Sequence, residues 1–279
     1  MGACITPLMN DERPNSLARP VFLTRTVVVV PALNEELSVA DVAGYWRGRG
    51  AGLVRVVDNG STDGTAEQAR SAGAEVLFEP RRGYGAAAWR GTLNLPAHIE
   101  WMLFSAADGS DRLDGPEAAA FQSAMDGGAD LVLGERTSLA ASQKSLGAAQ
   151  RLGNRLGCRL LALGWKHSFR DMASLRLIRR TAFDRLRLAD RGFGWNVEMQ
   201  VRAVEEGLRV VELPVRCYPR VAGRPKISGH PLGIVRASWG ILSTLAKLWC
   251  SRGQRLQNRQ ADEESDRGSG HRSGVSHSR

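Results

Sequence analysis

Carboxylate and hydroxyl side chains gather in two short segments, and each segment directly follows an apolar run. Residues 58–65 read DNGSTDGT, and residues 106–111 read AADGSD. Clustered carboxylates such as Asp108 and Asp111 suit a divalent cation, which would bridge two phosphates and carry the charge of a leaving diphosphate. Asp58 places a carboxylate where a nucleoside would lie at a strand end. Together the segments predict a nucleotide site. Taken alone, residues 58–65 are more typical of a helix-capping turn, and the alternative for residues 106–111 is a solvated acidic turn.

A third segment, residues 83–88, reads GYGAAA. Gly83 and Gly85 would let the backbone approach a ligand closely at a helix N-terminus, next to Arg81 and Arg82. Packing of the helix explains the small residues as well, so both interpretations stay open. In the segment VPALNEE, residues 30–36, we expect Asn34 to be the N-cap of the following helix.

The elements that must position these segments alternate between strand and helix. The β-branched run 26–30 ends at Pro31, which is typical of a parallel strand buried on both faces. Similar patterns predict strands at 53–57, 75–78 and 101–104, and helices at 35–47, 65–72 and 85–93. This alternation predicts one doubly wound, mostly parallel α/β sheet, with ligands bound at the carboxyl ends of its strands. The segments described above all fall at such ends.

Farther along the chain the alternation weakens. We expect helices at 116–125, 146–163 and 197–206, and strands at 130–133, 174–178 and 209–215. Residues 232–249 have an amphipathic pattern with two charged residues, Arg236 and Lys247, which predicts a helix at a membrane interface or one packed on the domain. The expected organisation is a flexible arm (1–25), a globular domain (26–230), this helix (231–250) and a disordered tail (251–279).

Composition narrows the class of partner. Lys and Arg exceed Asp and Glu by 38 to 29 in the 279 residues, and the net charge of +9 favours nucleotides, phospholipid surfaces or nucleic acid. Nucleic acid is disfavoured because the basic residues are dispersed and no nucleic-acid-binding motif accompanies them. The four cysteines show neither zinc-site nor disulfide spacing, which favours a reducing cytoplasm. No secretory signal pattern and no apolar run of roughly 18 residues is present, so we expect no membrane span.

The motifs also occur in an order that is typical of one family. From about Val27 to Thr244 the chain resembles the family 2 glycosyltransferases, especially the bacterial branch similar to dolichyl-phosphate mannose and polyprenyl-phosphate glucose synthases. The resemblance rests on VVVVPALNEE, VVDNGSTDGT, GYGAAAWRG, AADGSD, ADLVLGER, QRLGN, FRDMASLRLIRR, GFGWNVEMQVRA and RVAGRPKISG. It implies a Rossmann-like domain of the GT-A type that uses a nucleotide sugar.

The resemblance implies residue roles as well. Pro31, Ala32 and Glu35 would line the base and ribose site, and Asp58 would hydrogen-bond the base. Other nucleotide-sugar contacts would come from Gly83, Gly85, Ala107, Asp108, Arg136 and Arg224. The implied catalytic residues are Asp108, Glu198, Arg220 and Lys226.

Basic residues of the segment 220–229 match family positions that contact phosphates. Arg220 and Arg224 present forks that fit phosphate oxygens, and a loop containing glycine would close them and Lys226 over a leaving diphosphate. A solvated basic loop is the alternative.

By the resemblance, the acidic turn would hold Mg²⁺ or Mn²⁺, with Asp108 and Ser110 as ligands. Family members usually carry Asp-Ala-Asp at this turn, whereas this chain has Ala106 in place of the first carboxylate. One anionic ligand fewer predicts weaker binding of the cation. The departure also keeps open a sugar-nucleotide-binding subunit without catalytic activity.

The role of Glu198 depends on the acceptor. A hydroxyl acceptor would require Glu198 or Asp111 as a general base, whereas a lipid monophosphate is already largely ionised and attacks without one. Trp195 is either a platform for the sugar or part of the core. We expect inverting transfer from a UDP- or GDP-sugar to a polyprenyl phosphate, on the cytoplasmic face of a membrane; the alternative is a hydroxyl of a soluble or glycolipid acceptor.

Overall fold

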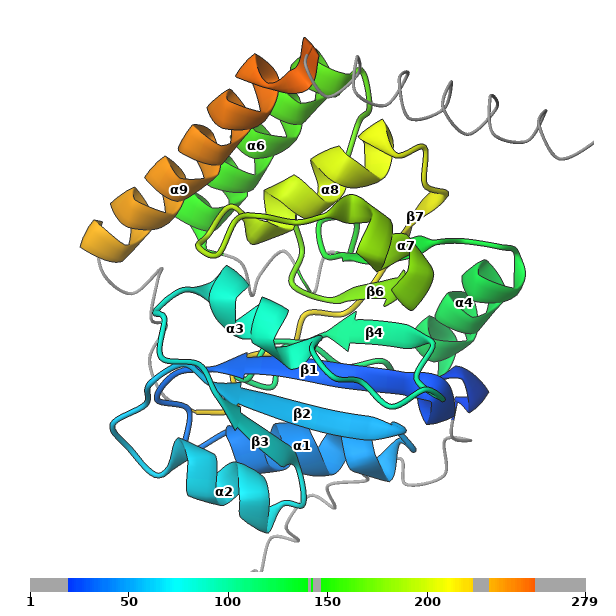
Figure 1. Cartoon of the computed structure of the whole chain (residues 1–279), viewed down its shortest axis with the longest axis vertical. Helices are drawn as coiled ribbons and strands as arrows, with labels where there is room; N and C mark the ends of the chain where they lie inside the picture. The colour runs from blue at the N-terminus through cyan, green and yellow to red at the C-terminus, as the bar shows by residue number, and fades with distance from the viewer. Residues whose placement is uncertain (1–19, 140–141, 143–146, 223–230, 254–279) are drawn as a thin grey trace, which may run out of the picture.

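The computed structural model describes residues 20–139, 142, 147–222 and 231–253 (Figure 1). Its strands are β1 (Thr26–Ala32), β2 (Leu53–Asp58), β3 (Glu75–Phe78), β4 (Trp101–Phe104), β5 (Leu131–Glu135), β6 (Arg176–Arg179) and β7 (Val210–Pro214). The helices are η1 (Val21–Arg25), α1 (Val39–Gly48), α2 (Thr65–Ser71), α3 (Tyr84–Gly91), α4 (Gly115–Asp126), α6 (Ala148–Trp165), α7 (Arg180–Leu186), α8 (Trp195–Glu205) and α9 (Pro231–Cys250). Most of the expected arm and tail lies outside the described residues.

The strands of the described part form one seven-stranded sheet in the order β3-β2-β1-β4-β6-β5-β7. β1 pairs in parallel with both β2 and β4, β2 with β3, and β5 with β7. β6 runs antiparallel between β4 and β5. The predicted doubly wound, mostly parallel α/β sheet is therefore confirmed, with one antiparallel strand that the chain pattern did not specify.

β1 lies inside the sheet, between β2 and β4, and its valines are buried on both faces of the sheet. Val27 and Val29 belong to one hydrophobic core, and Val28 and Val30 belong to the other, as the two-residue period of a strand requires. Residues of α1, α2 and α4 complete one core, and residues of α3, α6, α7, α8 and α9 complete the other (Figure 1).

The helix after β1 begins later than predicted. Residue Asn34 has a positive φ of 52°, and α1 starts only at Val39. Asn34 is therefore not the N-cap: its side-chain oxygen accepts a hydrogen bond from the N–H of Thr62, at 2.8 Å. A contact with the neighbouring loop has replaced the expected local cap.

Helix α7 was not predicted from the sequence, because β6 passes directly into it without a glycine or proline between them.

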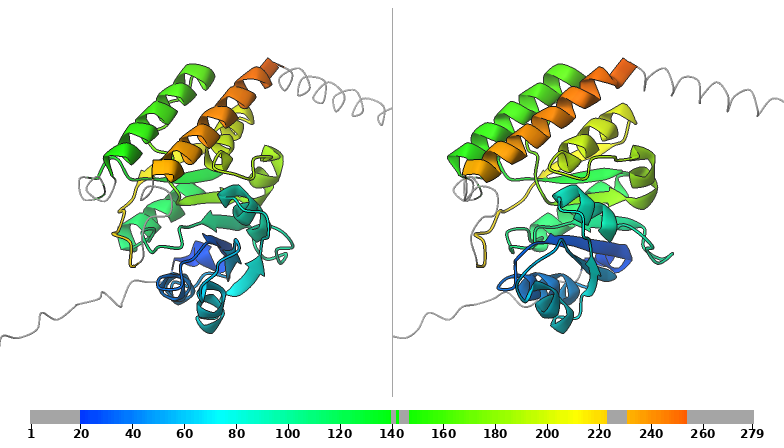
Figure 2. Two further views of the ribbon diagram at one scale, coloured as in Figure 1. Left: turned by 90° about the vertical axis from the view of Figure 1, so that its left-hand side faces the viewer. Right: turned by 60° about the vertical axis from the view of Figure 1, so that its left-hand side comes forward.

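α9 confirms the helix that was expected at 231–250, and it lies beside α6 (Figures 1 and 2). Leu245 and Leu248 are buried in the core, whereas Trp239 and Trp249 remain exposed. One face of α9 therefore packs on the domain and the other face is open. Among the described residues, no helix is long and apolar enough to cross a membrane.

Gly91 at the end of α3 allows the helix to lie directly on the sheet. A methyl group at this position would lie 2.3 Å from Cγ1 of Val29 in β1 and 3.2 Å from Cγ2 of Val57 in β2. The approach of α3 to the central strands therefore requires a residue without a side chain.

We predict that Gly91→Ala destabilises the protein by about 1–3 kcal/mol, because the added methyl overpacks the core. Gly44→Ala is the matched control: it lies in helix α1 with no atom within 4 Å of the added methyl, and it should stabilise by roughly 0.5–1 kcal/mol. Urea unfolding of both variants measures the difference. Equal effects of the two substitutions would contradict this packing.

Candidate functional site

The loops that follow β1 and β2 are joined by hydrogen bonds at the carboxyl edge of the sheet. The N–H of Asn34 donates to Oγ of Ser61 at 2.9 Å, and the N–H of Glu35 donates to Oγ1 of Thr65 at 2.8 Å. Asp58 is buried and accepts a hydrogen bond from the N–H of Ser61 at 2.8 Å. The hydroxyls predicted to line this edge therefore connect the two loops, and Glu35 is held in place by its backbone.

Arg220 joins two carboxylates that come from different strand ends. Its Nη1 lies 2.9 and 2.8 Å from the two carboxylate oxygens of Glu35, which follows β1. Its Nη2 lies 3.1 Å from Oδ2 of Asp108, which follows β4. Arg220 and Asp108 are each about one fifth exposed, and Glu35 is nearly buried. Three residues that are far apart in the sequence thus form one charged cluster at this edge.

The backbone around Arg220 explains why its side chain reaches Asp108. The N–H of Val221 donates to the carbonyl of Asp108 at 2.9 Å, and the N–H of Tyr218 donates to the carbonyl of Ser110 at 3.0 Å. Gly109 has a φ of 81°, and a methyl there would lie 2.5 Å from Cγ2 of Val221. Residues 217–221 therefore lie against the acidic turn, and the turn requires glycine.

The acidic turn orients Asp108 through Ser110. Oδ1 of Asp108 accepts hydrogen bonds from the N–H of Ser110, at 3.0 Å, and from its hydroxyl, at 2.6 Å. Oδ2 is left to face Arg220. The two residues predicted as metal ligands are thus adjacent, and the oxygen of Asp108 that faces away from Ser110 already contacts a positive charge.

Asp111 does not add a metal ligand to this turn. Its oxygens accept hydrogen bonds from the N–H of Ala106, at 2.8 Å, and from the hydroxyl of Ser174, at 3.1 Å. Burial raises the pKa of Asp111, and the nearby charge of Asp108 adds to this shift, although those hydrogen bonds and the charge of Arg136 lower it. Asp111 is thus a buried structural carboxyl.

The donor set fits a divalent cation only in part. The described residues contain no group of three or more His, Cys, Asp or Glu side chains that could hold a metal ion. Ala106 supplies no side-chain oxygen, so Asp108 and the Ser110 hydroxyl are the side-chain ligands that this turn offers. A cation at this turn would need further oxygen ligands, and the phosphates of a bound nucleotide carry them.

The glycines at the start of α3 make room for another loop of the same chain. A methyl on Gly83 would lie 2.3 Å from the carbonyl oxygen of Arg191, and one on Gly85 would lie 2.9 Å from the carbonyl oxygen of Asp190. The N–H groups of Gly85 and Ala86 donate to carbonyls of this same loop, at 3.0 and 2.8 Å. Packing, the open alternative, therefore explains the small residues, and contact of Gly83 and Gly85 with a ligand stays a prediction.

Glu198 holds that loop in place. The carboxylate is buried, and its Oε2 accepts hydrogen bonds from the N–H groups of Ala189, at 3.0 Å, and Asp190, at 2.7 Å. Its Oε1 lies 3.7 Å from Nε of Arg202. In this structure Glu198 is therefore an internal acceptor, and its expected action on an acceptor substrate stays a prediction.

Trp195 belongs to the core. Its side chain is fully buried, and its ring centroid lies 6.0 to 6.4 Å from those of Phe183, Phe104 and Trp89. Of the two interpretations of this residue, core packing is the one that the structure supports. A sugar could not stack on a ring that has no exposed surface.

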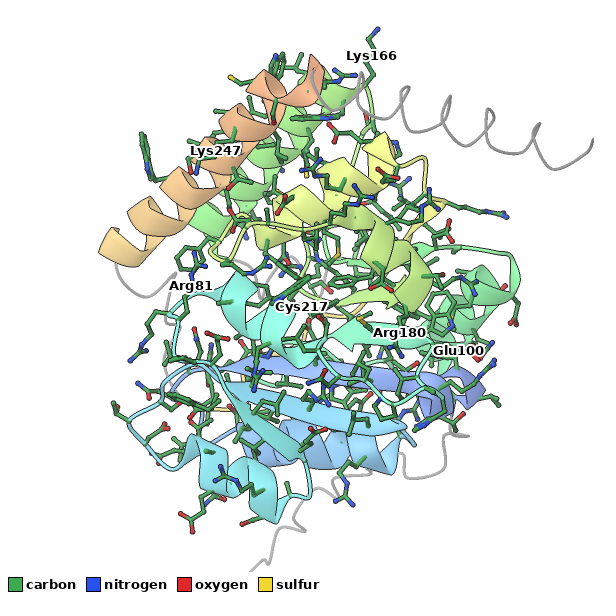
Figure 3. All side chains as sticks on the ribbon, in the orientation of Figure 1. Arg81, Glu100, Lys166, Arg180, Cys217 and Lys247 are labelled. Carbon is green, nitrogen blue, oxygen red and sulfur yellow. The ribbon has the colours of Figure 1, made fainter. Side chains whose placement is uncertain are left out.

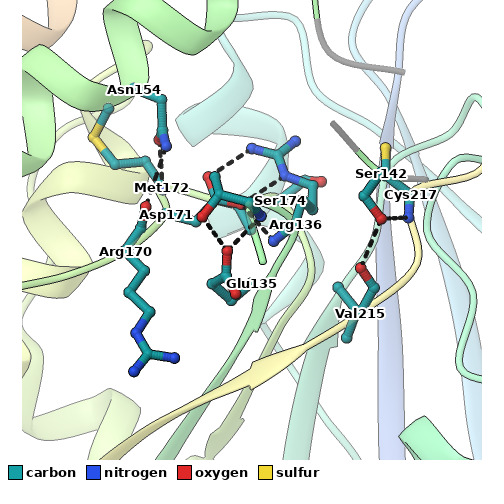
Figure 4. Close-up of polar contacts among 12 residues, drawn as sticks. Glu135, Arg136, Ser142, Asn154, Arg170, Asp171, Met172, Ser174, Val215 and Cys217 are labelled. Carbon is teal, nitrogen blue, oxygen red and sulfur yellow. Dashed lines mark hydrogen bonds and ion pairs between the residues drawn. The ribbon is translucent and has the colours of Figure 1, made fainter. Parts of the chain in front are cut away.

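Arg136 forms an ion pair with the buried carboxylate of Asp171 (Figure 4). The side-chain Nε and Nη2 of Arg136 lie 2.8 and 3.0 Å from the two carboxylate oxygens of Asp171. The backbone N–H of Arg136 donates to the same carboxylate at 3.0 Å. Burial alone would raise the pKa of Asp171, but the hydrogen bonds and charge of Arg136 lower it overall. Two of the Arg136 side-chain nitrogens are therefore engaged inside the protein, and its contact with a phosphate stays a prediction.

Sequence patterns missed two buried polar residues that connect separate segments of the chain. The side-chain amide of Asn59 donates to the carbonyls of Glu79 and Arg81, at 3.0 and 2.7 Å, while its oxygen accepts from the N–H of Gly83 at 2.8 Å. Arg176 is fully buried in β6, and burial lowers its pKa to about 10. A charged residue inside an apolar strand was the signal that could have identified Arg176.

The remaining predicted residues divide into small buried ones and ones that the structure does not describe. The carbonyl of Ala32 accepts from the N–H of Asn59 at 2.9 Å, and the carbonyl of Ala107 accepts from Oγ of Ser38 at 2.8 Å. Pro31 is half-buried beside Ala32 at the end of β1. Arg224 and Lys226 lie outside the described residues.

Figure 3 shows Cys217 near the middle of the molecule and Arg81 at the outer edge, near the start of α3.

Comparisons with known proteins give the family. No protein-family model matches the chain. An uncharacterized glycosyltransferase of Mycobacterium tuberculosis is 38% identical over 224 residues, which cover 77% of this chain and 97% of the relative. The polyprenol monophosphomannose synthase of Mycolicibacterium smegmatis is 27% identical over 244 residues, which cover 79% of this chain and 89% of that protein.

A solved structure gives the same fold. Glucosyl-3-phosphoglycerate synthase from Mycobacterium tuberculosis, in complex with Mn²⁺, uridine diphosphate and phosphoglyceric acid, matches with a TM-score of 0.59 at 22% identity. The match covers 80% of this chain and 77% of that structure. With the relatives above, it confirms the expected family and fold: this chain is a glycosyltransferase of family 2, with the GT-A fold.

Proposed function

We propose that this glycosyltransferase moves a sugar from a UDP- or GDP-sugar to the phosphate of a polyprenyl phosphate, with inversion at the anomeric carbon. The observation that carries the proposal is the charged cluster of Arg220, Glu35 and Asp108 at the carboxyl edge of β1 and β4. Support for the acceptor class comes from the relative named polyprenol monophosphomannose synthase. Support for the donor class comes from the solved relative in complex with uridine diphosphate.

Arg220 is the group that a donor diphosphate would engage. Its guanidinium contacts two carboxylates, and phosphate oxygens compete well for such a group because they accept two parallel hydrogen bonds. When Arg220 turns to the diphosphate, the Glu35 carboxylate becomes free to accept hydrogen bonds from ribose hydroxyls. Arg224 and Lys226 follow Arg220 closely in the sequence, and their positive charges would help to neutralise the leaving group.

A divalent cation belongs to the proposal as a component that binds together with the donor. Asp108 and the Ser110 hydroxyl would hold it on the protein side, because they are adjacent and Asp108 already faces a positive charge. The cation would supply charge neutralisation at the diphosphate. Because position 106 carries no carboxylate and Asp111 accepts hydrogen bonds from the chain, we expect Mg²⁺ or Mn²⁺ to bind weakly without nucleotide.

The chemical step needs no general base on the protein. A phosphate oxygen of the acceptor attacks the anomeric carbon, a new carbon–oxygen bond forms, and the bond to the diphosphate breaks with its electron pair. A lipid monophosphate is largely ionised near neutral pH, so no proton must be removed. Asp111 and Glu198, the carboxylates considered as bases for a hydroxyl acceptor, both accept hydrogen bonds from the chain itself. This arrangement favours a phosphate acceptor over a hydroxyl.

The experiment that tests the nucleotide site is a calorimetric titration of UDP, GDP and their sugar conjugates, with and without Mn²⁺. We expect one nucleotide to bind, with a higher affinity when Mn²⁺ is present. Arg220→Gln should weaken this binding about 10- to 100-fold, because a charge-assisted hydrogen bond contributes about 1.5–3 kcal/mol. Ala106→Asp should raise the affinity for Mn²⁺ alone, because it restores a carboxylate.

The matched control is Arg25→Gln, because Arg25 is an exposed arginine paired with Glu100 away from the site. Its nucleotide affinity should equal that of the unchanged protein. No binding of any nucleotide would overturn the transferase proposal. Nucleotide binding without turnover, unrescued by Ala106→Asp, would instead indicate a subunit without catalytic activity.

Substitution of Glu198 distinguishes the acceptor classes. Glu198→Gln keeps an oxygen for the N–H groups of Ala189 and Asp190, so a phosphate acceptor predicts a rate within about threefold of the unchanged protein. A hydroxyl acceptor that used Glu198 as its base predicts a loss of about 10²–10⁴ in rate. Glu198→Ala, the structural control, leaves both N–H groups without an acceptor and should destabilise the fold by at least about 1–3 kcal/mol. Initial rates and urea unfolding measure the two effects.

A further inference from the structure

Exposed apolar side chains concentrate on two neighbouring helices. Ten large hydrophobic side chains are exposed in the described part of the chain, and six of them belong to α6 and α9. Their exposed fractions range from 40% for Leu242 to 74% for Leu163. The six are Leu152, Leu156, Leu163, Trp239, Leu242 and Trp249. We call this set the α6–α9 apolar strip.

Each helix contributes one continuous row to the strip. Leu152, Leu156 and Leu163 are four and seven residues apart, which places them on one side of α6 at 3.6 residues per turn. Leu242 and Trp249 are seven residues apart and share a side of α9, with Trp239 next to them.

The two rows adjoin because the helices pack together. A methyl on Gly164 of α6 would lie 2.9 Å from the ring of Trp249, and the rings of Trp165 and Trp249 are 5.9 Å apart. Figures 1 and 2 show the helices lying side by side along their length. The α9 row therefore meets α6 at Trp249, beside Gly164, which directly follows Leu163 in the chain.

Positive charge borders this strip. Arg151, Arg155 and Arg159 are all exposed and follow one another every four residues along α6, so they form a row beside the leucines. Lys166 follows the end of α6, and Lys247 lies on α9; Figure 3 shows both at the upper end of the molecule. Neither helix contains an Asp or a Glu in its sequence. The strip thus combines exposed leucine and tryptophan side chains with basic side chains, and the two helices contribute no acidic side chain.

We propose that the α6–α9 face docks on an anionic phospholipid surface. Tryptophan suits the boundary between lipid and water because its ring is apolar and its N–H is polar. Basic side chains near such a surface are attracted by negatively charged head groups. A second copy of the chain fits less well, because two such faces brought together by a twofold axis would set the arginine rows of α6 near each other without acidic partners.

The start of α9 and the candidate site lie on the same side of the molecule. α9 begins on the side of the molecule toward which β1 runs, and that is the side of the Arg220 cluster (Figure 1). Docking through α6 and α9 would therefore bring the carboxyl edge of the sheet toward the surface where a lipid phosphate is available. This consequence rests on the proposed function; binding to the lipid surface itself does not.

The test is co-sedimentation of the full chain with vesicles of phosphatidylcholine, alone or mixed with phosphatidylglycerol. We expect binding to the mixed vesicles, at least tenfold weaker binding to phosphatidylcholine alone, and a loss of binding at high salt. The double variant Leu163→Gln, Trp239→Gln should reduce binding at least tenfold, because it removes two of the most exposed apolar groups. The double variant Arg155→Gln, Arg159→Gln should remove most of the preference for phosphatidylglycerol.

Matched controls are Val21→Gln, an exposed apolar residue of η1, and Arg70→Gln, an exposed arginine of α2. Both should bind vesicles like the unchanged protein, and all variants should keep their unfolding midpoints. Equal vesicle binding by the strip variants and the controls would overturn the proposal. A protein that ignores vesicles but forms dimers, lost in the strip variants, would overturn it in favour of a second copy.

The two proposals fail separately in these measurements. The vesicles contain no polyprenyl phosphate, so they report on docking alone. Transfer to a short-chain, water-soluble polyprenyl phosphate without vesicles reports on the reaction alone.

Discussion

The parallel pairing of β1 with β2 and β4 is the constraint on which the rest of the structure depends. The four consecutive valines of β1 are buried on both faces of the sheet, and β1 has a parallel strand on each side. The register then aligns Ala32 with Asp58 and Val29 with Phe104, and the loops that follow these three strands leave the sheet at one edge. Glu35 and Asp108 meet there as a consequence, although 73 positions separate them in the sequence.

Two nearby carboxylates repel each other unless a cation lies between them, and Arg220 supplies that cation. The ion pairs are partly accessible, so they hold the loop 217–221 against the acidic turn while leaving Arg220 within reach of an incoming anion. The pair of Arg136 and Asp171 differs because its carboxylate is buried, so breaking the pair would leave the charge of Asp171 without this partner inside the protein. The two arginine pairs therefore differ in the exposure of the carboxylate, which is 21% for Asp108 and 1% for Asp171.

The sequence predicted the features that follow from local pattern. The valine run, the alternation of strands with helices and the polar segments after each strand were enough to predict the sheet and the edge where the site lies. Contacts between distant segments left no local pattern. The side chain of Asn34 accepts a hydrogen bond from Thr62 and does not cap its own helix, and Arg136 pairs with Asp171, which is 35 residues away in the sequence. Gly83 resembled a ligand-binding glycine because a close approach to the carbonyl of Arg191 and a close approach to a phosphate require the same small residue. The antiparallel β6 was likewise set by its neighbours β4 and β5.

The central claim is that a phosphate of the acceptor attacks the sugar donor. The most direct measurement is transfer of labelled sugar from the nucleotide sugar that binds, with polyprenyl phosphate and the matching polyprenol offered in parallel. We expect a labelled product with the phosphate, in which mild acid releases the sugar from its phosphodiester link, and no product with the alcohol. Labelling of the alcohol at an equal or higher rate would overturn the phosphate mechanism, because it would require a general base that Glu198 and Asp111, as placed, do not provide.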